Sequence, residues 1–137
     1  IYEESLPLCL ITPSSVMIHK NIFADVGIFD ETLPACEDYD LWLRITHKYP
    51  VGLIDKELIV KHGGHKDQLS RSIPTLDKYR IYAMKKMLGS GTLTERQRSA
   101  TIKEIENKAR IYAHGCLKNG KEKEGEEYFA LIDALHK

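Results

Sequence analysis

The chain has 137 residues, with 20 basic and 20 acidic side chains, so its formal net charge at pH 7 is zero. This balance does not point to nucleic acid or an acidic membrane as a partner, because both attract strongly basic surfaces. The length suits one domain, or one small domain with an extension, and the 42% apolar share is ordinary for a soluble globular protein.

No run of the sequence approaches the roughly 18 apolar residues of a membrane-spanning helix, and the N-terminus lacks the basic and apolar regions of a signal peptide. The chain begins with Ile1 rather than Met, so we expect either a piece of a longer protein or a processed product. The three cysteines, Cys9, Cys36 and Cys116, are far apart and in no metal-binding spacing. They predict reduced thiols in a cytoplasmic protein.

Short apolar or alternating runs predict β-strands in the first half of the chain. Residues 8–11 and 15–18 flank a Thr-Pro-Ser turn, and residues 51–54 and 57–61 suit a hairpin or a kinked strand. The fold class expected for this half is therefore α+β, with a few short strands among helices.

Two helices are expected between these strands. Residues 20–26 predict a short helix that Gly27 ends. Residues 38–47 predict the next helix, and Pro50 prevents it from continuing. One face of this second helix carries three apolar side chains, which are Leu41, Trp42 and Ile45.

From about residue 73 onward nearly all of the sequence has helical spacing. Residues 73–88 predict a helix that ends at a Gly-Ser-Gly turn. Thr94 with Gln97 predicts a capping box that opens a long helix running to Lys118. After an Asn-Gly break, residues 121–136 predict the last helix.

The final two helices are similar to a single tetratricopeptide-type hairpin, in which Gly125 would allow the helices to approach closely. One such unit cannot form a solenoid alone. An antiparallel helix pair packed on its neighbour is the simpler interpretation. The residues that carry the likeness are Ala113, Cys116, Gly120, Gly125, Phe129 and Ile132.

Two adjacent acids, Glu37 and Asp38, open the predicted helix 38–47. Unpaired backbone N–H groups and the helix dipole favour negative charge in a first helical turn, so a carboxylate there stays ionised at neutral pH. Asp40 and Arg44 lie four residues apart and can pair on the exposed side of the helix. From composition alone, favourable charge at a helix start explains both acids.

The run Gly-Ile-Phe-Asp-Glu from Gly27, followed by Glu-Asp-Tyr-Asp-Leu-Trp-Leu-Arg from Glu37, resembles the C-terminal half of the catalytic domain of family 2 (GT-A type) glycosyltransferases. The resemblance covers roughly residues 11–71. It implies that residues 1–72 are the acceptor-side part of a GT-A domain, and that residues 73–137 are a helical extension. The nucleotide-binding half of the family, with its strand-borne Asp-x-Asp, does not occur in this sequence.

The resemblance assigns the general base to the second acid of the Glu-Asp pair, which is Asp38, with Glu37 binding acceptor hydroxyls or orienting the base. Asp38 and Asp40 form an Asp-x-Asp string, but residues two apart on a helix point to nearly opposite sides, so we do not assign a metal to them. Trp42 belongs to the buried face rather than to a sugar platform.

Further site residues are implied after the predicted strands. In several GT-A enzymes a histidine at this point completes the metal site, and His62 or His65 could do so. The alternative is a pair of solvated loop histidines. Gln68, Ser70 and Arg71 continue a stretch that in the family can contact the donor diphosphate.

The function expected from the resemblance is sugar transfer from a nucleotide-sugar donor to a saccharide or lipid acceptor hydroxyl, with inversion. The full-length enzyme would use a divalent cation, Mg or Mn, and none is expected to bind this fragment tightly. The fragment alone would be inactive, and a homo-oligomer is a candidate assembly. Any membrane association would come from the rest of the parent protein. The alternative function is a non-catalytic interaction module built on the helical tail.

Overall fold

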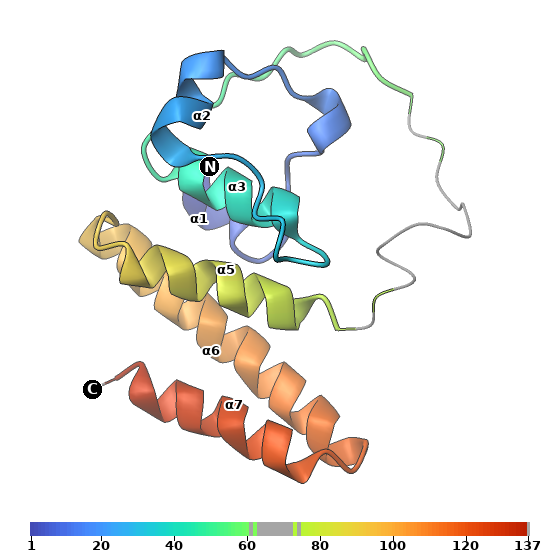
Figure 1. Ribbon diagram of the computed structural model, residues 1–137, viewed down its shortest axis with the longest axis vertical. Helices are drawn as coiled ribbons and strands as arrows, with labels where there is room; N and C mark the ends of the chain where they lie inside the picture. Colours follow the sequence, from blue (N-terminus) through green and yellow to red (C-terminus); the bar gives the residue numbers. More distant parts are fainter. Residues whose placement is uncertain (61, 63–72, 74, 137) are drawn as a thin grey trace. The chain divides into compact units, whose positions relative to one another are not determined.

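The computed structural model describes residues 1–60, 62, 73 and 75–136 (Figure 1). The chain forms two compact units, which span Ile1–Leu76 and Asp77–Lys137. Each unit has its own helices and its own buried side chains.

The first unit contains three α-helices and one turn of 3-10 helix in its described residues. These elements are α1 (Tyr2–Ser5), the 3-10 turn η1 (Pro13–Ser15), α2 (Lys20–Val26) and α3 (Glu37–Thr46). The bounds of α2 and its end at Gly27 confirm the sequence prediction, since Gly27 has a φ of 81° and its N–H donates to the carbonyl of Phe23.

The apolar face of α3 forms the core of this unit's central cluster. Leu41, Trp42 and Ile45 are buried, which confirms their predicted face and the assignment of Trp42 to the core. Partly buried apolar side chains from the segments before and after α3 pack against them. These side chains are Cys9, Ile11, Val16, Ile18, Ile22, Phe23, Val26 and Tyr49. The helix is thus held mainly by packing rather than by intrinsic propensity.

The predicted α+β fold class is wrong, because the part of the chain that the structure describes contains helices and no strand. The backbone at Thr12 and Val16 is extended, so the local preference of these runs for β geometry is retained. A strand, however, exists only as part of a hydrogen-bonded ladder with a partner. Residues 8–11, 16–18, 51–54 and 57–60 are irregular segments instead, and Ser15 belongs to the 3-10 turn η1. Met17 is 98% exposed and Leu53 89% exposed.

The second unit is a three-helix assembly of α5 (Asp77–Gly89), α6 (Glu95–Lys118) and α7 (Glu122–Ala134) (Figure 1). The capping box at the start of α6 is confirmed, because Thr94 accepts from the Gln97 N–H while the Gln97 side chain accepts from the Thr94 N–H. Helix α5 begins at Asp77, later than the expected residue 73. The turn before it includes Thr75, whose φ is 64°.

Helices α6 and α7 pack as an antiparallel pair, as predicted. The rings of Tyr112 and Tyr128 pack at a tilt of 53° with their centroids 4.5 Å apart, and the Tyr112 hydroxyl donates to Glu124 at 2.7 Å. Glu124 also accepts from Lys78 of α5 at 3.1 Å, so one carboxylate joins all three helices. The Tyr112 hydroxyl, and after it the Lys78 ammonium, holds the pKa of Glu124 below its ordinary value.

The close contact predicted at Gly125 is present. A Cβ added to this buried glycine would lie 3.1 Å from the carbonyl oxygen of Ala113 and 3.1 Å from a methyl group of Leu117. Neither α7 nor the backbone of α6 can yield easily, so a large side chain would force the helices apart.

We therefore expect Gly125→Leu to lower the free energy of unfolding of the second unit by about 1–3 kcal/mol. Gly115 is the matched control, because a Cβ on this α6 glycine would meet no atom within 4 Å. Gly115→Ala should stabilise α6 by about 0.5–1 kcal/mol. Thermal unfolding followed by far-ultraviolet circular dichroism measures both. Equal effects of the two substitutions would show that Gly125 is not a packing position.

None of the helices in the described part of the chain combines the length and the hydrophobicity that crossing a bilayer requires.

Candidate functional site

The candidate site lies at the N-terminus of α3, where the chain turns sharply into the helix. Asp30 opens the preceding turn by accepting from the backbone and the hydroxyl of Thr32, at 3.1 and 2.6 Å. Cys36, directly before the helix, has a φ of 62°, a left-handed conformation that costs a non-glycine residue on the order of 1 kcal/mol or more. The residue directly before Glu37 and Asp38 therefore has a strained backbone.

Asp38 is half-buried in the first turn of α3, as predicted for a residue at a helix start. Its Oδ1 accepts from the N–H of Tyr39 at 2.7 Å, and its Oδ2 lies 3.7 Å from the Cys9 thiol, which donates to it. The helix dipole favours the ionised carboxylate at this position. Each oxygen keeps a lone pair beyond the bond described, so the group can accept a proton from a hydroxyl brought to it.

Glu37 precedes Asp38 in the same turn and is also half-buried. The next side chain, Tyr39, is buried, and its hydroxyl donates to the carbonyl of Leu6 at 2.7 Å. This bond ties the start of α3 to the segment after α1 and fixes the turn that carries both acids. The structure therefore brings Glu37 and Asp38 together on one helical turn, while their chemical roles stay predictions.

Asp40 and Arg44 pair as predicted, but the expected exposed location is wrong. Asp40 is 1% exposed, and Arg44 donates to it through Nε at 2.9 Å and Nη2 at 2.7 Å. Arg44 also donates to the carbonyls of Val26 and Ile28. One guanidinium therefore closes the C-terminal end of α2 onto α3, a contact that the four-residue spacing alone could not reveal.

Gly27 lies against the same Arg44 guanidinium. A Cβ at this position would lie 3.4 Å from Nη1 of Arg44, and the φ of 81° favours glycine. The contact between Gly27 and Arg44 thus gives a structural reason for the spacing of these two residues, which carries the family resemblance. It joins α2 to α3 and sets the position of the helix start that bears Asp38.

Of the site residues expected after the extended segments, His62 alone falls within the part of the chain that the structure describes. His62 is exposed. His65, Gln68, Ser70 and Arg71 lie outside the described residues. No group of three or more His, Cys, Asp or Glu side chains that could hold a metal occurs among the described residues.

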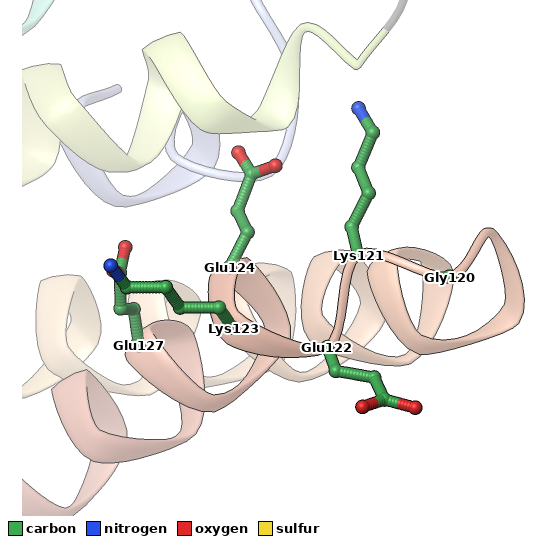
Figure 2. A pocket seen from close by; sticks show the side chains of 6 residues that line it. All are labelled: Gly120, Lys121, Glu122, Lys123, Glu124 and Glu127. Atoms are coloured by element: carbon green, nitrogen blue, oxygen red, sulfur yellow. The ribbon is translucent and has the colours of Figure 1, made fainter.

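Two hollows occur elsewhere in the described residues. A groove of about 770 Å³ in the first unit is lined mainly by apolar side chains, among them Met17, Trp42 and Leu53. A shallow hollow of about 660 Å³ lies at the turn between α6 and α7. Figure 2 shows Lys121 and Glu122 of its lining pointing to opposite sides, so the charges there do not converge on a ligand. Asp38 lines neither hollow.

Comparison with known proteins gives a partial similarity. No family model matches the sequence, and no solved structure matches it. The chain is 39% identical over 70 residues to a protein from Rickettsia felis named an uncharacterized glycosyltransferase, and equally so to one from Rickettsia conorii. A third, from Rickettsia bellii, is 40% identical over 70 residues. Each match covers 50% of this chain but only 10–12% of the relative, so the chain spans about a tenth of the proteins that it matches. Half of this chain is thus distantly similar to part of proteins named glycosyltransferases.

Proposed function

We propose that this chain is the acceptor-side portion of a longer glycosyltransferase, which moves a sugar from a nucleotide-sugar to an acceptor hydroxyl. The observation that carries the proposal is the similarity of half of the chain to glycosyltransferases about ten times longer than the matched part. The geometry at the start of α3 supports it, because a half-buried carboxylate stands in the first turn of a helix, where backbone N–H groups and the helix dipole favour negative charge.

In this proposal Asp38 is the general base. As the acceptor oxygen approaches the anomeric carbon, its proton passes to a carboxylate oxygen of Asp38. The new C–O bond forms while the bond to the nucleoside diphosphate breaks, and the diphosphate leaves with the electron pair. Direct displacement of this kind inverts the anomeric configuration. A positioned base typically contributes about 10²–10⁴-fold to such a step.

Glu37, on the same turn, has the role of holding or orienting the acceptor through its carboxylate, which can accept from sugar hydroxyls. The divalent cation, and contacts of His62, His65, Gln68, Ser70 and Arg71 with it or with the donor diphosphate, are proposals for the longer enzyme. The proton transfer described above uses only Asp38 of this chain.

The experiment that tests the proposal compares the full-length protein with the isolated 137-residue chain. With a panel of uridine and guanosine diphosphate-sugars, the full-length protein should release a nucleoside diphosphate in the presence of an acceptor. Because we assign the donor pocket to other parts of that protein, the isolated chain should show no saturable nucleotide-sugar binding at micromolar concentrations in calorimetry.

Clear binding of a nucleotide-sugar by the isolated chain would show that the donor pocket lies within these residues. A full-length protein that consumes no donor on any acceptor tested would instead favour the alternative function, a non-catalytic interaction module built on the three-helix unit.

A further inference from the structure

Cys9 lies in the segment after α1, far from Asp38 in sequence, yet it contacts the candidate base. Its Sγ is 3.7 Å from Oδ2 of Asp38 and 3.3 Å from the carbonyl oxygen of Ile11. The thiol is half-buried, and it belongs to the apolar side chains that pack on the α3 cluster. Its place is therefore fixed by packing from one side, and its single S–H proton is shared between two acceptors, of which the charged carboxylate is the stronger.

The contact completes the support of the Asp38 carboxylate. Oδ1 is held by the N–H of Tyr39, which belongs to the same helical turn. With this hydrogen bond alone, the carboxylate could still rotate about its Cβ–Cγ bond, because a terminal sp³–sp² torsion has a broad energy profile. The Cys9 thiol supplies a donor to the other oxygen from outside the helix, so the two together define the plane of the carboxylate.

We propose that Cys9 is a positioning residue for Asp38, which orients the carboxylate through its thiol and does not itself react. This inference rests on the proposed role of Asp38 as general base. A precisely placed base matters because a misplacement of about 1 Å can cost roughly 100-fold in rate.

The local charges keep this thiol protonated and thus able to donate. Burial, and after it the negative charge of Asp38, raises the pKa of Cys9 to about 12. Cys36 adds a smaller contribution in the same direction, while a backbone hydrogen bond with Ile11 acts in the opposite one. A thiolate would be the reactive form, so Cys9 beside an ionised Asp38 is a donor and a poor nucleophile.

The contact is tested in the isolated chain by the rate at which iodoacetamide alkylates Cys9 at pH 9, read by mass spectrometry of the Cys9 peptide. Asp38→Asn removes the charge that opposes the thiolate, so alkylation should become about three- to tenfold faster. Glu37→Gln is the matched control, since it neutralises the neighbouring acid and should leave the rate within about twofold. Equal acceleration by both variants, or none by Asp38→Asn, would overturn the contact.

The positioning role is tested in the full-length protein by a double-mutant cycle on kcat for sugar transfer. Cys9→Ala should lower kcat by about tenfold, within the cost of a misplaced group, and Cys9→Ser, which keeps a donor, should restore most of it. In the Asp38→Asn background Cys9→Ala should cause no further loss, because the residue acts through Asp38. An equal loss in both backgrounds would make Cys9 a structural residue and contradict the proposal.

The two arms separate this inference from the proposed function. If Asp38→Asn leaves transfer intact, the general-base assignment fails and the positioning role falls with it, even where the alkylation result shows that the contact exists. If Asp38→Asn abolishes transfer while Cys9→Ala does not change it, Asp38 remains the base and only the role of Cys9 is refuted.

Discussion

Asp38→Asn in the full-length protein should lower kcat for sugar transfer by roughly 10²–10⁴-fold, the usual contribution of a general base. The amide oxygen can still accept from the Tyr39 N–H, as the carboxylate oxygen does. Folding should therefore be retained, while the group that takes the acceptor proton is lost. The measurement is kcat with saturating donor and acceptor, accompanied by the unfolding transition of the variant.

Asp55→Asn is the matched control, because Asp55 is an exposed acid in the segment after α3. The same chemical change there should leave kcat within about twofold, as expected for a surface group away from the reaction. If Asp38→Asn keeps most of the activity, or if both variants lose it equally, Asp38 is not the base and its acid is only a favourable charge at a helix start.

Arg44→Ala should lower the free energy of unfolding of the first unit by about 3–5 kcal/mol. The substitution leaves the nearly inaccessible Asp40 without its guanidinium partner, and the carbonyls of Val26 and Ile28 lose a donor. Breaking one side of a buried ion pair is costly because the remaining charge loses its guanidinium partner in a poorly solvated place. This cost far exceeds the value of about 0–1 kcal/mol that an exposed pair would have.

The single tryptophan, Trp42, lies in the core of the first unit, so its fluorescence during urea unfolding reports that unit. The double variant Asp40→Leu/Arg44→Met should be less destabilised than Arg44→Ala, because it removes both charges together. A loss below about 1 kcal/mol for Arg44→Ala would mean that the pair behaves as a surface ion pair in solution.

The helices were predictable because their signals are local. Gly27 ends α2 through its own backbone conformation, and Thr94 with Gln97 opens α6 through bonds within one turn. The packing of Gly125 was predictable as well, since a small residue between two apolar stripes leaves few other arrangements. In each case the residues that determine the element belong to the element or to its neighbour in sequence.

The prediction of strands failed because an alternating sequence indicates a preference for extended backbone and does not show that a partner strand is present. Leu53 and Leu58 lie in runs typical of strands, yet they are exposed and irregular in the described structure. The burial of Asp40 was missed for a related reason. The carbonyls that Arg44 reaches lie at the end of α2 and just after it, 16–18 residues away, and no periodicity encodes that contact.

The candidate site was only partly predictable. The Glu37-Asp38 pair and its helix start follow from the sequence, but nothing in the spacing of Cys9 links its thiol to residue 38, which it contacts in the structure. Only the fold brings the segment after α1 to the start of α3. The apolar neighbours of Cys9, Leu8 and Leu10, were the one available signal, and they do not specify what the thiol contacts.

The most direct test of the general-base assignment is chemical rescue of the Asp38→Asn variant by azide, with the donor that supports transfer in the full-length protein. Azide attacks carbon without first losing a proton, so it needs no base. The account predicts that azide restores release of the nucleoside diphosphate in Asp38→Asn and yields a glycosyl azide of inverted configuration, with little effect on the wild-type protein. Failure of azide to accelerate donor turnover in a folded Asp38→Asn variant that still binds donor would contradict the role of Asp38 as the base.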